Sequence, residues 1–275
     1  MSEEVNPTPD TTPIYGASER YEQTAPEEPA RLGPLSRLSG TLFSPGETFA
    51  DVNRKPTWIA PMIIAILTVV ASTVFFQWRV HPDWDSIMRT QIKKRLERSN
   101  QSLTEEQMQQ QVNFAKNIAK FSPIIGTVFT LVIYVVLAGV FALGLIFIQA
   151  KTTFKKILSV VTWTRASIGV VEAIVTMASL MVRDEAELRS IDPTQPAGIV
   201  PSNLAAFLPS TSSAVLKSLA GSIDIFTIWS LILLSIGFAI IAGSRKITAG
   251  KTAKVVFGFW LVYVLGKLGF AAAFG

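Results

Sequence analysis

The sequence predicts an all-α fold, an integral membrane bundle of five transmembrane helices with a disordered N-terminal tail. The 275-residue chain is 49% hydrophobic and only 16% charged, whereas soluble domains carry about 25% charged residues. Its mean hydropathy is positive, at +0.39. The apolar residues gather in runs of about 20, the length at which a helix crosses a hydrocarbon core of about 30 Å.

Residues 1–34 are predicted to form the disordered tail. They hold six of the fifteen prolines and seven acidic residues, with almost no apolar periodicity. Such a segment buries too little apolar surface to offset the conformational entropy lost on ordering. Residues 35–275 are predicted to form one transmembrane domain.

Five apolar segments are predicted to span the membrane: residues 58–78, 123–149, 157–182, 225–243 and 255–274. Trp58 and Trp78 bound the first, about 30 Å apart at helical rise, which places both indoles near the two interfaces. Asp224 precedes the fourth segment, where an acidic residue favours a helix N-terminus. The third segment contains Arg165 and Glu172, and the fifth contains Lys267.

Two polar stretches separate these segments. Residues 85–99 are predicted to form a short cationic amphipathic helix. A second helix is expected after the capping-box spacing of Ser102 and Glu105, which gives a helical hairpin over the membrane surface. Residues 183–222 carry four prolines, and we expect a loop with one short helix near Ala205 or Ala214.

The short loops indicate the orientation. The loop after the second segment has three lysines and no acid, and the loop after the fourth has four basic residues and no acid. Such loops favour the cytoplasmic side, so we expect a cytoplasmic N-terminus and an external C-terminus. The loop between the first two segments disagrees, because it carries eight basic residues.

Residues 42–61 read LFSPGETFADVNRKPTWIAP. This run resembles bacterial members of the YIP family, membrane proteins named for the Ypt/Rab-interacting proteins of eukaryotes. Residues 222–237, with Asp224, Phe226 and Trp229 in order, and the stretch SLTEEQMQQQ are also similar to that family. The resemblance implies five helices, a cytoplasmic N-terminus and no known catalysis. The Asp-Leu-Tyr-Gly-Pro signature of eukaryotic relatives is absent, so a GTPase partner is not inferred.

The run that leads into the first span is a candidate interfacial element. Its apolar and proline residues are Phe43, Pro45, Phe49, Pro56 and Trp58. Together with neighbouring basic residues they suit an anionic inner leaflet. The alternative interpretation is a packed lead-in to the first span.

The intramembrane charges Arg165, Glu172 and Lys267 are the other candidate site. Arg165 and Glu172 are seven residues apart, so they project from one helix face, and Glu172 and Lys267 lie at comparable depth. Unpaired charges there cost at least about 2.5 kcal/mol, so they face the interior and find partners. We predict a Glu172–Lys267 ion pair with Arg165 one layer nearer the cytoplasm. The alternatives are a role in fixing helix register only, or a Lys267 that reaches the outer interface.

Composition excludes several chemistries. The chain has no cysteine and one histidine, His81, so thiol nucleophiles, iron–sulfur clusters, multi-histidine metal sites and zinc-protease motifs are ruled out. No phosphate-binding loop occurs, and basic residues are not interleaved with aromatics as in nucleic-acid binding. We therefore expect no catalytic residues, metal, cofactor or nucleic-acid partner.

The sequence favours a non-catalytic membrane-organising or adaptor component of the bacterial cytoplasmic membrane. Its expected partners are the lipid bilayer and either other membrane proteins or a second copy. The alternative function is a small transporter or channel that uses Arg165, Glu172 and Lys267.

Overall fold

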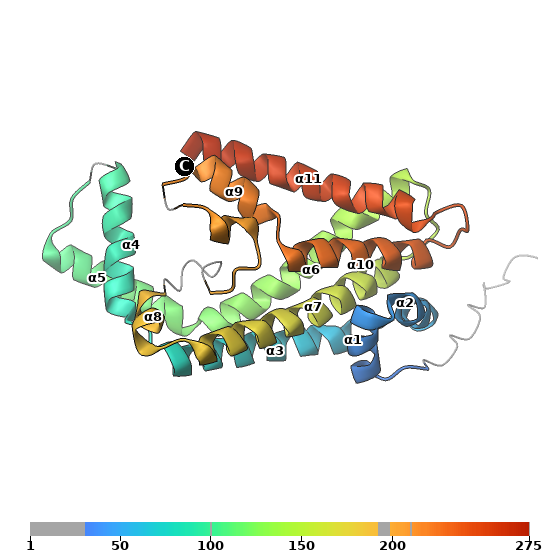
Figure 1. Ribbon diagram of the computed structural model, residues 1–275, viewed down its shortest axis with the longest axis horizontal. Coiled ribbons are helices and arrows are strands. Elements are labelled where there is room, and N and C mark those ends of the chain that lie inside the picture. The colour runs from blue at the N-terminus through green and yellow to red at the C-terminus, as the bar shows by residue number, and fades with distance from the viewer. Residues whose placement is uncertain (1–30, 100, 192–198, 210, 275) are drawn as a thin grey trace, which may run out of the picture.

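The computed structural model describes residues 31–99, 101–191, 199–209 and 211–274, which are almost entirely helical (Figure 1). The tail predicted to be disordered lies outside the described residues, except for residues 31–34. The chain then forms two short helices, α1 (Pro34–Phe43) and α2 (Pro45–Arg54). Each has a proline in its first turn, where a missing N–H is harmless.

Five longer apolar helices follow: α3 (Ile59–Val80), α6 (Ser122–Phe147), α7 (Phe154–Val182), α10 (Ile225–Ile241) and α11 (Ala249–Phe274). Among the described residues, α3, α6, α7 and α11 are long and apolar enough to cross a membrane. The helix α10 is equally apolar but has 17 residues, about 25 Å at helical rise. The predicted all-α bundle is confirmed, with a fourth helix shorter than a typical span.

The fifth helix begins earlier than its apolar segment suggests. It starts at Ala249 instead of residue 255, so Lys251 and Lys254 are helical. Within this extra turn, the buried Thr252 hydroxyl donates to the Ser235 carbonyl of α10 at 2.6 Å. The contact with α10 therefore accompanies an extension of the helix beyond the apolar stretch. The apolar stretch alone indicates only the part of the helix that is suited to lipid.

The helix α7 lies at the centre of the bundle. It packs against α3, α6 and α10, and α11 packs on the far side against α10 and α6. The first half of α7 is buried, with Trp163 and Ile168 almost fully enclosed. Phe141 of α6 and Phe238 of α10 meet there with ring centroids 5.1 Å apart.

Two basic loops meet at the end of the bundle near α1 and α2. The Lys151 N–H, between α6 and α7, donates to the Ala242 carbonyl after α10 at 2.9 Å. Gly243 makes this contact possible with a φ of +68°, and a Cβ there would lie 2.5 Å from the Lys151 oxygen. Only glycine adopts this conformation freely.

The remaining helices lie at the opposite end (Figure 1). The two helices of the predicted hairpin are confirmed as α4 (Trp84–Ser99) packed against α5 (Glu105–Lys120). Their position over the membrane surface stays a prediction. The capping box, however, joins Thr104 to Gln107, each backbone N–H donating to the other's side chain. The prediction from Ser102 was wrong because Thr104 and Gln107 have the same spacing nearer the first helical turn.

The second polar stretch contains α8 (Glu185–Ser190), the 3₁₀ helix η2 (Leu204–Phe207) and α9 (Ala214–Ser222). The sequence predicted one short helix, near Ala205 or Ala214, and the structure has a helix at each of these two positions. Asp224 caps α10 as predicted, with its carboxylate accepting from the Thr227 N–H at 2.9 Å.

Candidate functional site

A buried ion pair joins α1 to α2. The Arg37 guanidinium lies 2.8 Å from the Asp51 carboxylate, and the two side chains are 2% and 1% exposed. Arg37 also donates to the Thr57 hydroxyl at 2.6 Å and to the Lys55 carbonyl at 3.2 Å. Its donors therefore hold α1, the end of α2 and the entry to α3 together.

The same pair is attached to the bundle. The Arg37 guanidinium carbon lies 5.9 Å from the Trp163 ring centroid of α7, within cation–π range. The Ser167 hydroxyl of α7 donates to the Leu38 carbonyl of α1 at 2.9 Å. We call α1 and α2, residues 34–54, the N-terminal hairpin. These contacts fix it against α7.

Asp51 remains ionised in this setting. Burial alone raises its pKa, but hydrogen bonds from the Arg31 N–H and the Arg37 side chain, with the Arg37 charge, outweigh burial and lower that pKa below its usual value. The Arg31 N–H lies 2.9 Å from Oδ1. The carboxylate is thus a pre-formed anionic partner for Arg37.

The predicted lead-in residues separate into two groups. Phe49 is fully buried with Val52 in the main core, and Pro56 is also buried. Phe43 is 79% exposed and Trp58 is 37% exposed, while Pro45 begins α2. The lead-in is therefore packed on one face, as in the second interpretation, and open on the other. Contact of the open face with the inner leaflet stays a prediction.

Arg165 and Glu172 face one polar cavity of about 450 Å³ between α3, α6 and α7. Its lining also includes hydroxyl side chains from all three helices and Tyr134. The Arg165 guanidinium lies 3.4 Å from the Ser230 hydroxyl of α10, and Tyr134 of α6 lines the same cavity. The two charges do share a face, as the seven-residue spacing requires.

The predicted Glu172–Lys267 ion pair is wrong. Both side chains are described, and no ion pair joins them. The Lys267 amine instead lies 3.1 Å from the Ser222 hydroxyl at the end of α9 and 6.0 Å from the Tyr263 ring centroid. The reason is that α11 packs against α9, α10 and α6, which leaves Lys267 outside the cavity. The alternative, a Lys267 that reaches the outer interface, stays a prediction.

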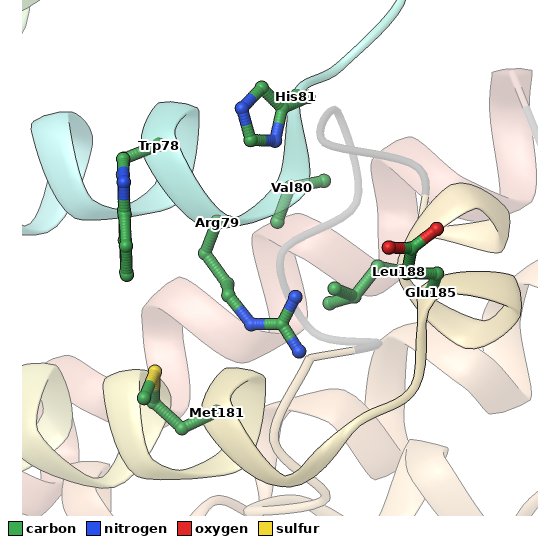
Figure 2. Close-up of a pocket in the computed structure, with 7 residues that line it drawn as sticks. All are labelled: Trp78, Arg79, Val80, His81, Met181, Glu185 and Leu188. Carbon is green, nitrogen blue, oxygen red and sulfur yellow. The ribbon is translucent and has the colours of Figure 1, made fainter.

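Figure 2 shows a second cavity, of about 680 Å³, where α3 ends beside the turn from α7 to α8. The Arg79 guanidinium donates to the Arg183 carbonyl across it at 2.7 Å. His81 ends α3 with a φ of 47°. The Arg79 contact connects two helix ends, which is a structural role.

Sequence reasoning missed Arg37 and Asp51, and also the hydroxyls that line the cavity. Asp51 stands between the apolar residues Phe49 and Val52 in the chain, and a carboxylate on the buried face of a short helix implies a partner. The sequence did not indicate that Thr68, Ser72 and Thr130 line a cavity, since single hydroxyl side chains are common in membrane helices. No group of three or more His, Asp or Glu side chains in the described parts of the chain could hold a metal ion.

Comparison with known proteins gives the family. The model of the Yip1 domain matches residues 39–271. This chain belongs to the Yip1 domain family. It is also 24% identical over 248 residues to "Membrane protein YknW" of Bacillus subtilis (strain 168), covering 90% of this chain and 93% of that protein. No solved structure matches.

The Yip1 match covers the N-terminal hairpin from residue 39 and all five apolar helices. The resemblance seen in residues 42–61 is therefore confirmed, and the chain is a membrane protein. The environment of its membrane-embedded helices is a lipid bilayer.

Proposed function

We propose that this Yip1-family protein is a non-catalytic membrane-organising or adaptor component of the bacterial cytoplasmic membrane. Its contact surface is the outer face of the N-terminal hairpin. The observation that carries this proposal is the buried Arg37–Asp51 pair, 2.8 Å apart, which holds two short helices in one arrangement. A fixed surface binds a partner without the entropy cost of ordering it.

The outer face of the hairpin supports a binding role. Leu35 and Phe43 are 78% and 79% exposed, and Arg54 and Lys55 lie at its end. Exposed apolar side chains beside cations suit an anionic membrane surface or a membrane-protein partner. A second copy of this chain offers the same chemistry.

The position of the basic loops supports a cytoplasmic location for the hairpin. Lys151 is hydrogen-bonded to the loop after α10, and that loop leads directly to Arg245 and Lys246. Both acid-free loops therefore meet at the hairpin end of the bundle. Short basic loops favour the cytoplasmic side.

The packing disfavours a pore. Between the polar cavity and the hairpin, the described interior is filled by an apolar cluster that includes Phe49, Phe141, Trp163 and Phe238. A continuous polar lining is required for ion or solute conduction. This interior supports an adaptor over a channel.

Site-specific photocross-linking tests the proposal. A photoreactive amino acid at Ser36, exposed on α1, is expected to give discrete adducts with a membrane protein or a second copy in native membranes. The matched control is the same label at Val262, exposed on α11, which is expected to give lipid adducts only.

Arg37→Ala is expected to reduce the Ser36 adducts at least several-fold and to leave the Val262 adducts unchanged. Ser36 adducts with lipid alone would overturn the adaptor proposal.

A small transporter is the second candidate, favoured by the cavity that contains Arg165 and Glu172. The test is solute flux into liposomes that carry the purified full chain. Flux that is present with the natural sequence and lost in Glu172→Gln would replace the adaptor proposal with the transporter.

A further inference from the structure

The cavity between α3, α6 and α7 contains two opposite charges without an ionic contact to each other. The Arg165 guanidinium lies 3.4 Å from the Ser230 hydroxyl, and no ion pair of the described residues joins it to Glu172. No hydrogen bond or ion pair of the described residues reaches the Glu172 carboxylate. Both side chains nevertheless line the same space, and both lie in the middle of α7.

This arrangement is costly without a ligand. Charges at such a depth in a membrane helix are normally paired, and Lys267, the other intramembrane cation, is bound elsewhere. The guanidinium has five N–H donors, more than its contact with the Ser230 hydroxyl uses. The carboxylate has its full set of acceptor sites available.

The two charges define the chemistry of a complementary ligand. The backbones of Arg165 and Glu172 lie about 10 Å apart along the axis of α7, seven residues at helical rise. A phosphate joined to an ammonium through two carbons carries the charge complementary to each residue.

The cavity also has an entrance and a polar wall. Phe129, 63% exposed, and Ile133 belong to its lining, so it reaches the outer surface of the bundle. Thr68 and Thr130 add hydroxyl oxygens, although their protons already go to backbone carbonyls at 2.8 Å. These oxygens accept hydrogen bonds, which an ammonium group supplies.

We infer that this cavity binds a zwitterion of the phosphoethanolamine class, with its phosphate on Arg165 and its ammonium on Glu172. The site lies within the helices and outside the hairpin, so the inference goes beyond the proposed adaptor function. The same chemistry occurs in a phosphatidylethanolamine headgroup and in free phosphoethanolamine, and the test has an arm for each source.

The experiment is native mass spectrometry of the delipidated full chain. In the lipid arm, phosphatidylethanolamine is expected to bind at least tenfold more tightly than phosphatidylglycerol, which lacks the ammonium. In the soluble arm, free phosphoethanolamine is added instead. Binding in either arm supports the inference and identifies the source, provided that Glu172→Gln weakens it about tenfold.

Gly169→Leu provides a steric test that leaves both charges in place. Gly169 lines the cavity, and a Cβ at this position meets nothing within 4 Å. The added side chain therefore enters the empty space and is expected to block binding. Gly258→Leu on α11 is the matched control, since its Cβ also meets nothing and it lies outside the cavity.

Three results would overturn the inference. The first is no zwitterion binding in either arm, and the second is binding that survives both Gly169→Leu and Glu172→Gln. The third is equal binding of phosphatidylglycerol. Lys267→Gln removes a charge outside the cavity and is expected to leave binding unchanged. Cross-linking at Ser36 reports on the hairpin separately, so failure of one proposal is distinguishable from failure of the other.

Discussion

Arg37 and Asp51 show how a pair of charged residues can organise the entry to a membrane domain. Both are buried, and each satisfies its hydrogen bonds through the other and through nearby backbone groups. A buried pair contributes little compared with an apolar replacement, but removal of one partner leaves an uncompensated charge. The structural role of the pair is therefore best measured by substituting one of the two residues and leaving the other in place.

Arg37→Ala is expected to destabilise the N-terminal hairpin by about 3–5 kcal/mol, because Asp51 stays buried without its counter-ion. Hydrogen exchange of residues 34–54 in the purified protein measures the loss of protection. The control is Arg54→Ala, since Arg54 lies 3.5 Å from Asp51 with its side chain 32% exposed, and solvent screening weakens an ion pair whose cation is partly exposed. Equal effects of the two changes would contradict the buried-pair account.

The ionised state of Asp51 predicts a pH dependence. Hydrogen bonds lower its folded pKa below the usual value of 3.8. The associated stability is therefore fully present above pH 3.8 and is lost as the pH falls through the lower folded value. Hairpin protection, corrected for intrinsic exchange, is expected to stay constant at neutral and mildly acidic pH and to fall only in strong acid. In Asp51→Asn this acid transition should disappear, and its persistence would point to another group.

At the scale of helices, α10 approaches α7 and α2 closely at Gly237. A Cβ built there lies 2.5 Å from Val160 Cγ1 and about 3.2 Å from the Phe49 ring, with both neighbours in the buried core. Both neighbours are fully buried, so an added methyl group requires one of them to shift within a packed core. The small residue thus sets how tightly the hairpin and two membrane helices pack together.

Gly237→Ala is expected to lower the thermal stability of the purified protein by about 1–3 kcal/mol, the usual cost of overpacking a filled core. Gly258→Ala is the comparison, because its Cβ meets nothing within 4 Å and alanine favours the helix. If both variants unfolded at the same temperature, α10 would not be packed as the structure describes.

The positions of the long helices were predictable from the sequence because their apolar runs match the thickness of the bilayer. Helix ends determined by tertiary contacts were not, as with α11, whose first turn is extended by the contact of Thr252 with α10. The shared cavity face of Arg165 and Glu172 follows from helical periodicity. The partner of Lys267 could not be predicted in this way, because the depth of a residue along its helix does not determine which neighbouring helix that face packs against.

At the scale of the whole molecule, the five apolar helices place α1 and α2 at one end and α4 and α5 at the other (Figure 1). With five crossings, as the sequence predicts, the hairpin and the C-terminal end of α11 face opposite compartments. The adaptor proposal depends on this arrangement, since a cytoplasmic partner reaches only one end of the bundle.

Cysteine labelling in intact cells tests this arrangement most directly, because the chain contains no cysteine of its own. Single changes at Ser39 on α1 and at Ser102 between α4 and α5 introduce exposed thiols at the two ends. With a membrane-impermeant maleimide, Ser102→Cys should label in intact cells and Ser39→Cys only after permeabilisation. Labelling of both positions in intact cells, or of Ser39→Cys alone, would contradict the account.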